Sequence, residues 1–218
     1  MDFGRAFSYV FQDPDWVKKV LLAALISLIP IVGQLYLVGW SLAVAQRIIQ
    51  GQRDIPLPDI EFGEHLGRGF KAAIIGLVYA LPAILFATPI WLFPIIGVSA
   101  EMSEETLSIV TLILSVCCGG LVLIYSILMA LMIPAATGNF LASGRLGAAF
   151  NVGQVFGLVR AAPGPHLMII LGNIIVGLIA PLGAIACAVG VFATAAYGTL
   201  ISSHMIGQAY RSAVSLQR

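Results

Sequence analysis

Few residues in the apolar part of this chain have side chains that could do chemistry. The polar groups within its uncharged runs or at their ends are sparse, namely Gln34, Asn139, Asn173 and His204. A polar cavity or ligand site would draw on Gln34, Asn173 and His204. Simpler roles are also available, because Asn173 can hydrogen-bond a neighbouring helix. His204 can be solvated at the membrane surface or cap helix carbonyls, and a lone histidine is weak evidence for a pigment or metal.

Catalytic motifs are missing from the sequence. It contains no His-Glu-x-x-His motif and no Gly-x-Ser-x-Gly motif. No Asp or Glu lies inside any of its long apolar runs. The buried acids that proton-driven carriers commonly use are therefore lacking. Cys117, Cys118 and Cys187 have a spacing that fits neither a zinc site nor a disulfide framework. We therefore predict a protein that is not an enzyme and has no cofactor or metal.

The composition is that of an integral membrane protein. Charged residues make up 10% of the chain, against roughly a quarter in soluble domains. Four runs contain no charged side chain: 20–46, 72–100, 106–144 and 167–203. A single spanning helix needs only about 20 such residues. The net charge of +1 gives no indication of nucleic-acid binding.

Two of the uncharged runs contain helix breakers near their middle. As one helix, 167–203 would be roughly 55 Å long against a hydrocarbon core of about 30 Å, so we expect two crossings that turn at Pro181 and Gly183. The run 20–46 would be roughly 40 Å long, which a single tilted span could accommodate. Pro30 and Gly33 favour a turn there too, as does a faint similarity between 31–51 and 188–208.

The distribution of charge supports the two turns. The connection 101–105 has three acids and no base, whereas the basic residues lie in the N-terminal arm, at 47–71, at 145–160 and in the C-terminal tail. Two end hairpins would place all these basic segments on the cytoplasmic side. We predict an all-α membrane helix bundle of about six transmembrane or half-spanning helices in three hairpins. It would cross the cell membrane several times, with both termini in the cytoplasm.

These elements form one predicted membrane domain over 1–218. Apolar residues at helical spacing, such as Phe3, Phe7 and Val10, predict an amphipathic surface helix, and Phe62, Leu66 and Phe70 predict another. Such helices anchor a bundle or offer a docking face to a partner. The predicted order is an interfacial helix 1–12, hairpin 14–50, a cytoplasmic loop with a short helix 51–69, hairpin 70–138, a cytoplasmic connection 139–165, hairpin 166–208 and a tail 209–218.

Small residues recur at every fourth position of the last predicted helix. This stripe predicts a close packing seam, formed by Ala186, Gly190, Thr194, Gly198 and Ser202. Packing against the first hairpin is favoured over dimerisation. In the third predicted helix, Pro82, Pro89 and Pro94 favour kinks or a break, which neighbouring helices accommodate or which open a central cavity.

Several short motifs carry a resemblance to a known family. They are Phe7-Ser-Tyr-Val-Phe-Gln-Asp13, Ile29-Pro-Ile-Val-Gly33, Gly39-Trp40 leading to Arg47, Leu57-Pro58, and His204-x-x-Gly207-Gln208. With these, the chain resembles a prokaryotic family of uncharacterised integral membrane proteins, the domain-of-unknown-function family four thousand and thirteen. Asp59-Ile60 stands where that family often has an aromatic residue. The resemblance implies a membrane architecture and no particular activity.

Three functions remain open at this point. A non-enzymatic membrane scaffold or accessory subunit, with membrane shaping as a further role, agrees with the surface helices and the lack of catalytic groups. Its partners would be the lipid bilayer and other membrane subunits or a second copy. A small-solute transporter or channel is the alternative, and would need a polar cavity lined by residues such as Gln34, Asn173 and Thr194. A membrane enzyme is the least favoured.

Overall fold

The computed structural model of the chain describes residues 2–52 and 56–217, apart from the side chains at 180 and 186–189. These residues form helices and turns, with no strand among them, so the predicted all-α class is confirmed. Three helices are long and apolar enough to cross a membrane: Phe62–Ser99, Glu104–Ser143 and Pro163–Ile185. The finer prediction of six helices in three hairpins remains a prediction.

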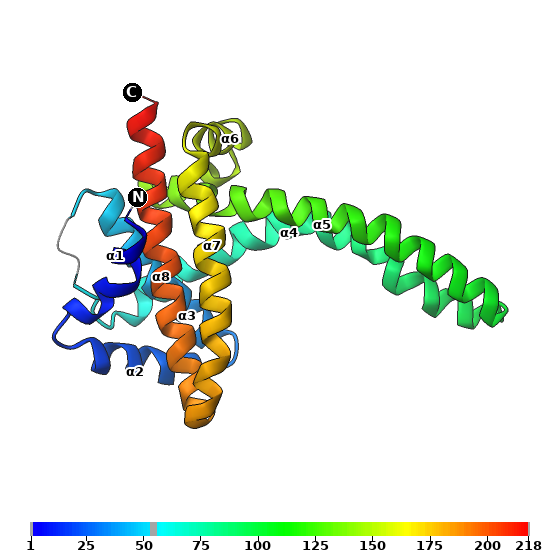
Figure 1. Cartoon of the computed structure of the whole chain (residues 1–218), viewed down its shortest axis with the longest axis horizontal. Helices are drawn as coiled ribbons and strands as arrows, with labels where there is room; N and C mark the ends of the chain where they lie inside the picture. The colour runs from blue at the N-terminus through cyan, green and yellow to red at the C-terminus, as the bar shows by residue number, and fades with distance from the viewer. Residues whose placement is uncertain (1, 53–55, 218) are drawn as a thin grey trace. The chain divides into compact units, whose positions relative to one another are not determined.

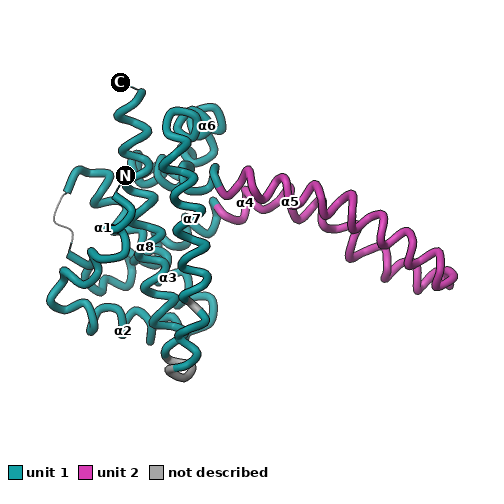
Figure 2. The backbone as a smooth tube through the Cα atoms, viewed as in Figure 1, with its two compact units in different colours: residues 1–75, 131–218 teal, residues 76–130 magenta. Residues whose placement is uncertain are grey.

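The chain divides into two compact units (Figure 2). Unit 1 combines residues 1–75 and 131–218, and unit 2 is 76–130. Figure 1 shows the helices in sequence order. They are α1 (Phe3–Ser8), η1 (Tyr9–Gln12), α2 (Trp16–Ser27), α3 (Val32–Ile49), α4 (Phe62–Ser99), α5 (Glu104–Ser143), η2 (Leu146–Phe150), α6 (Val152–Ala161), α7 (Pro163–Ile179), η3 (Ala180–Ala186) and α8 (Cys187–Leu216).

Unit 1 is organised around its last helix. α8 contacts α1, α2, α3, α6 and α7, and Figure 1 shows it running beside α7. The core between α8 and the first helices contains Tyr9, Tyr36, Trp40 and Leu200. The N-terminal helices pack against this core, and the Tyr9 hydroxyl donates to the carbonyl oxygen of Leu200 at 3.1 Å.

The chain turns between α2 and α3 within 28–31, next to the breakers Pro30 and Gly33. Ile31 has φ 63° and ψ −63°, and the amide of Val32 donates to the carbonyl of Pro30 at 2.7 Å. This is a strained γ-turn, which L-amino acids rarely adopt. Gly33 is required for packing, since a Cβ there would overlap the carbonyl of Ile26.

The second breaker pair lies in a 3-10 turn between α7 and α8. Pro181 and Gly183 both belong to η3. A Cβ at Gly183 would overlap the Gly190 carbonyl oxygen and the Thr194 hydroxyl, so this glycine allows the chain to fold back closely on α8.

Three predicted boundaries differ from the structure. The surface helix expected inside the loop 51–69 is the first part of α4, which continues from Phe62 to Ser99 with no proline before Pro82. α5 extends past 138 to Ser143. The predicted tail 209–218 is helical to Leu216, since Ala209 and Ala213 are buried.

Unit 2 is a helical hairpin formed by parts of α4 and α5. The two helices touch through Tyr125, whose hydroxyl donates to the Tyr79 carbonyl at 2.8 Å and whose ring meets Phe86 edge to face. α4 remains helical through Pro82, Pro89 and Pro94, so the break that we considered is absent. Most large side chains of the unit are apolar and exposed, Trp91 by 75%.

Candidate functional site

A buried carboxylate joins the N-terminal arm to the segment before α4. Asp13 accepts hydrogen bonds from the Lys19 ammonium at 3.0 Å, the Leu57 amide at 2.8 Å and the Asp15 amide at 2.8 Å. Burial opposes ionisation of Asp13, but these three donors outweigh it and lower the pKa of the carboxyl group below its ordinary value. Lys19 also donates to the Leu57 carbonyl at 2.9 Å.

The segment 56–59, which we call the strap, is held in place through its backbone carbonyl groups. Three of these carbonyl oxygens each lie within hydrogen-bonding distance of a side-chain nitrogen. Trp40 Nε1 donates to Pro58 at 3.0 Å and Arg47 donates to Pro56 at 2.8 Å. His65 Nε2 lies 2.8 Å from the Asp59 carbonyl oxygen. The strap thus connects α2, α3 and α4 at one end of unit 1.

At the same end, α3 and α4 approach each other backbone to backbone. A Cβ on Gly39 would overlap the His65 carbonyl oxygen and would lie 2.6 Å from the Gly69 amide nitrogen. A Cβ on Gly69 would in turn overlap the Leu35 carbonyl oxygen. Only glycine at both positions permits this contact.

Arg68 lies beside the helix contact and is almost fully engaged. Its guanidinium donates to the Gly39 carbonyl at 3.1 Å, lies 3.0 Å from His65 Nδ1, and pairs with Glu64 one turn earlier on α4. A charged group tied in this way positions its neighbours and leaves little free charge of its own.

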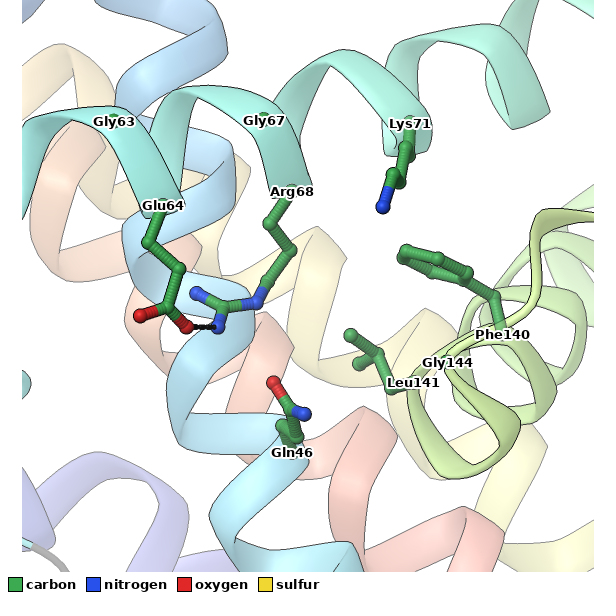
Figure 3. Close-up of a pocket in the computed structure, with 9 residues that line it drawn as sticks. All are labelled: Gln46, Gly63, Glu64, Gly67, Arg68, Lys71, Phe140, Leu141 and Gly144. Carbon is green, nitrogen blue, oxygen red and sulfur yellow. Dashed lines mark hydrogen bonds and ion pairs between the residues drawn. The ribbon is translucent and has the colours of Figure 1, made fainter.

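A pocket of about 350 Å³, with the charged side chains of Glu64, Arg68 and Lys71 in its lining, opens next to this arginine. Figure 3 shows its lining, in which Lys71 extends toward Phe140 while Arg68 and Glu64 face each other. The lining residues are Gln46, Gly63, Glu64, Gly67, Arg68, Lys71, Phe140, Leu141 and Gly144. We call this the polar pocket.

A second, larger cavity of about 580 Å³ lies among α3, α4, α5, α7 and α8. Its walls are mostly apolar, with Leu35, Leu42 and Ile133 among them, and the hydroxyl groups of Ser41 and Ser203 hydrogen-bond each other at 3.0 Å. We call this the apolar groove. Such a cavity is within the size range of small-molecule and lipid sites.

The three residues proposed for a polar cavity lie apart. Gln34 donates to the Ser27 carbonyl at 2.9 Å, which caps the end of α2. Asn173 accepts a hydrogen bond from Ser202 at 2.6 Å across α7 and α8. His204 is buried, stacks on Tyr9 with ring centroids 4.3 Å apart, and lies 2.9 Å from the Gln208 amide nitrogen. None of the three lines the polar pocket or the apolar groove.

The small-residue stripe of α8 faces α7 and η3 at the positions described. A Cβ on Gly198 would overlap Val176, Ser202 bonds Asn173, and the Gly190 carbonyl borders Gly183. Thr194 donates to that same carbonyl at 3.0 Å. The Ala186 side chain lies outside the described residues. The first hairpin instead meets another face of α8, where Gly207 touches Ala45 and Ile48.

Sequence reasoning missed the polar pocket and the central role of Asp13. The only signal was indirect: Lys71 is the last charged residue before a long uncharged run. Among residues 2–52 and 56–217, no group of three or more His, Cys, Asp or Glu side chains could hold a metal ion. The remaining histidine, His166, is buried with its Nδ1 at 2.8 Å from the Ala162 carbonyl.

Comparison with known proteins identifies the family. No curated protein matches the chain, and no solved structure does. The profile of a family described as proteins of unknown function, DUF4013, matches residues 22–209. That range includes the α2–α3 turn, the strap, both cavities and most of α8. The chain therefore belongs to the DUF4013 family, as its sequence motifs predicted.

Proposed function

We propose that this protein is a non-enzymatic membrane scaffold or accessory subunit, and that unit 2 is its assembly surface. The observation that carries the proposal is the character of unit 2, whose most apolar helical stretch in α5 has no buried residue. Soluble proteins rarely expose contiguous apolar patches larger than a few hundred Å². Lipid and a membrane partner are the two environments that such a surface suits.

Several polar groups in unit 1 are engaged in holding the fold, which supports a structural role. Asp13, His65 and Arg68 each bond backbone groups of the strap or of α3. Gln34, Asn173 and Thr194 are each bonded within or between helices. The transporter alternative therefore has no polar cavity formed by these three residues to support it.

The proposed topology has the protein cross the cell membrane several times with both termini in the cytoplasm. The contact between the chain ends supports a common side, because the Asp2 amide donates to Gln208 at 2.6 Å and Gln208 donates back to the Asp2 carbonyl at 3.1 Å. The acidic turn 101–105 would lie on the opposite side.

Photo-crosslinking in intact membranes tests the assembly surface. A benzophenone amino acid would replace Trp91 of unit 2, with Phe156 of α6 as the matched control, because both are exposed aromatic residues. We expect a discrete protein adduct, with another subunit or a second copy, at position 91 and none at 156. Adducts with lipid alone at 91 would contradict the proposal.

Cysteine labelling from outside the cell tests the topology. Single cysteines would replace Arg5, Val32, Ser103 and Ser215 in a chain lacking the three native cysteines. We expect labelling only at 32 and 103. Labelling at position 5 would mean that the first segment crosses once. Silence at 32 alone would mean a turn that stops short of the outer surface.

A further inference from the structure

The polar pocket and the apolar groove are lined by neighbouring parts of the same three helices. On α3, Leu42 lines the groove and Gln46 lines the pocket, four residues further on. On α5, Thr137 lines the groove and Leu141 the pocket. On α4, the pocket residue Lys71 directly precedes the groove residue Ala72.

These shared helices place the two cavities next to each other. The strap lies beside the polar pocket, because a neighbouring pocket lined by Pro58 and Asp59 shares Gln46, Glu64 and Arg68 with it. The polar pocket has charged side chains in its lining, whereas the lining of the groove is mostly apolar. A molecule with a polar head and an apolar chain matches this sequence of environments.

The charge of the polar pocket favours an anionic head. It contains two cations, Arg68 and Lys71, and one carboxylate, Glu64. Glu64 is paired with Arg68, whereas Lys71 forms no ion pair with any described residue and is directed into the pocket (Figure 3). An ammonium group placed in this way is a point charge suited to a phosphate.

The groove favours an acyl chain over a polar solute. The Ser41 and Ser203 hydroxyls are bonded to each other, and those of Ser202 and Thr199 are bonded to Asn173 and to the Ala196 carbonyl. Apart from Thr137, the other side chains of its wall are aliphatic, for example those of Val38, Ala73 and Ile206.

We propose that unit 1 binds one anionic glycerophospholipid, with its phosphate at Lys71 in the polar pocket and one acyl chain in the apolar groove. The site requires that the chain lies in a membrane, but it does not depend on the assembly role of unit 2. Crosslinking at Trp91 tests that role, and lipid retention tests this site, so the two proposals fail separately.

The test is native mass spectrometry of the full chain released from nanodiscs with equal amounts of phosphatidylglycerol and phosphatidylcholine. We expect one phosphatidylglycerol to be retained per chain. Lys71→Ala should lower its retention by about tenfold or more, the usual effect of removing a hydrogen bond to a charged group. The matched control is Lys18→Ala, because Lys18 is also exposed but lies on α2 outside both cavities, and it should leave retention unchanged.

The acyl chain is tested separately through Ala73, an exposed residue of the groove wall. Ala73→Phe, or the smaller Ala73→Leu if the first variant loses its cooperative unfolding, should fill the groove and lower retention without changing any charge. Inorganic phosphate at millimolar concentration should not displace the lipid.

Three results would overturn the proposal. Equal retention of both lipids would remove the anionic preference. Equal losses from Lys71→Ala and Lys18→Ala would show diffuse attraction between a basic surface and the bilayer. Displacement by inorganic phosphate, with no effect of filling the groove, would show a simple anion site without an acyl chain.

Discussion

Replacing Asp13 by asparagine should destabilise unit 1 substantially. The Asp13 side chain is 3% exposed and accepts three hydrogen bonds, one of them from the Lys19 ammonium, whose side chain is 17% exposed. Asparagine removes the charge and one of the two acceptor oxygens. The ion pair with Lys19 is lost, and one backbone amide, of Asp15 or Leu57, is left without an acceptor. We expect the free energy of unfolding to fall by about 2–4 kcal/mol.

Asp59→Asn is the matched control for this variant. Asp59 also pairs with Lys19, at 3.5 Å, but its side chain is 83% exposed. Exposed ion pairs contribute little, so this variant should lose no more than about 1 kcal/mol. The two variants make the same chemical change beside the same lysine and differ in burial and backbone bonding.

The assay is unfolding by titration with sodium dodecyl sulfate in mixed micelles, followed by tryptophan fluorescence. Trp40 is fully buried and donates to the strap at Pro58, so its emission reports on the region that Asp13 holds. An Asp13→Asn loss no larger than that of Asp59→Asn would refute the reasoning, because burial and backbone bonding would then contribute nothing.

The remaining predictions concern pH, a strained turn and a helix contact. Because folding lowers the pKa of Asp13, its ionised carboxylate stabilises the fold fully when the pH is above the ordinary pKa of 3.8. The difference in unfolding free energy between wild type and Asp13→Asn should therefore narrow as the pH of the titration falls below 3.8, and a constant difference would contradict this. Ile31→Gly should increase the free energy of unfolding by about 0.5–1 kcal/mol and so raise the unfolding temperature, because Ile31 has a positive φ and its side chain is 75% exposed. A lower unfolding temperature would show that the turn is unstrained. Gly39→Ala should cost about 1–3 kcal/mol in the same thermal scan by forcing α3 and α4 apart, whereas Gly63→Ala on α4, with open space around it, should be neutral or stabilising; similar effects of both would argue against the close contact.

Local chemistry explains which parts of the fold were predictable. Pro30 and Pro181 predicted helix ends, and the chain turns beside both of them. Helical spacing at Phe62, Leu66 and Phe70 correctly indicated a helix. It could not show that this helix continues into α4, because amphipathic and membrane-spanning stretches can join without any breaker between them. The family could also be recognised from short motifs, since they cover most of the chain.

The candidate site was less predictable because it depends on contacts between distant segments. His204 is a ring buried against Tyr9, and nothing near it in sequence indicates that neighbour. Asp13 lies just before α2 in the sequence, but its bond to the Leu57 amide joins residues 44 positions apart. The polar pocket requires the register of α3, α4 and α5 with respect to one another, which single-helix periodicity does not contain.

The central position of α8 has a consequence for how the protein is made. Tyr9 bonds the Leu200 carbonyl, Ser41 bonds Ser203, and Asp2 bonds Gln208, so these contacts of the first helices form only after the last helix has been made. About 170 residues separate the end of α3 at Ile49 from the end of α8 at Leu216, and a ribosome translates that length in roughly 10–30 s. During that interval the face of α3 around Ser41 lacks its native contact with Ser203 of α8.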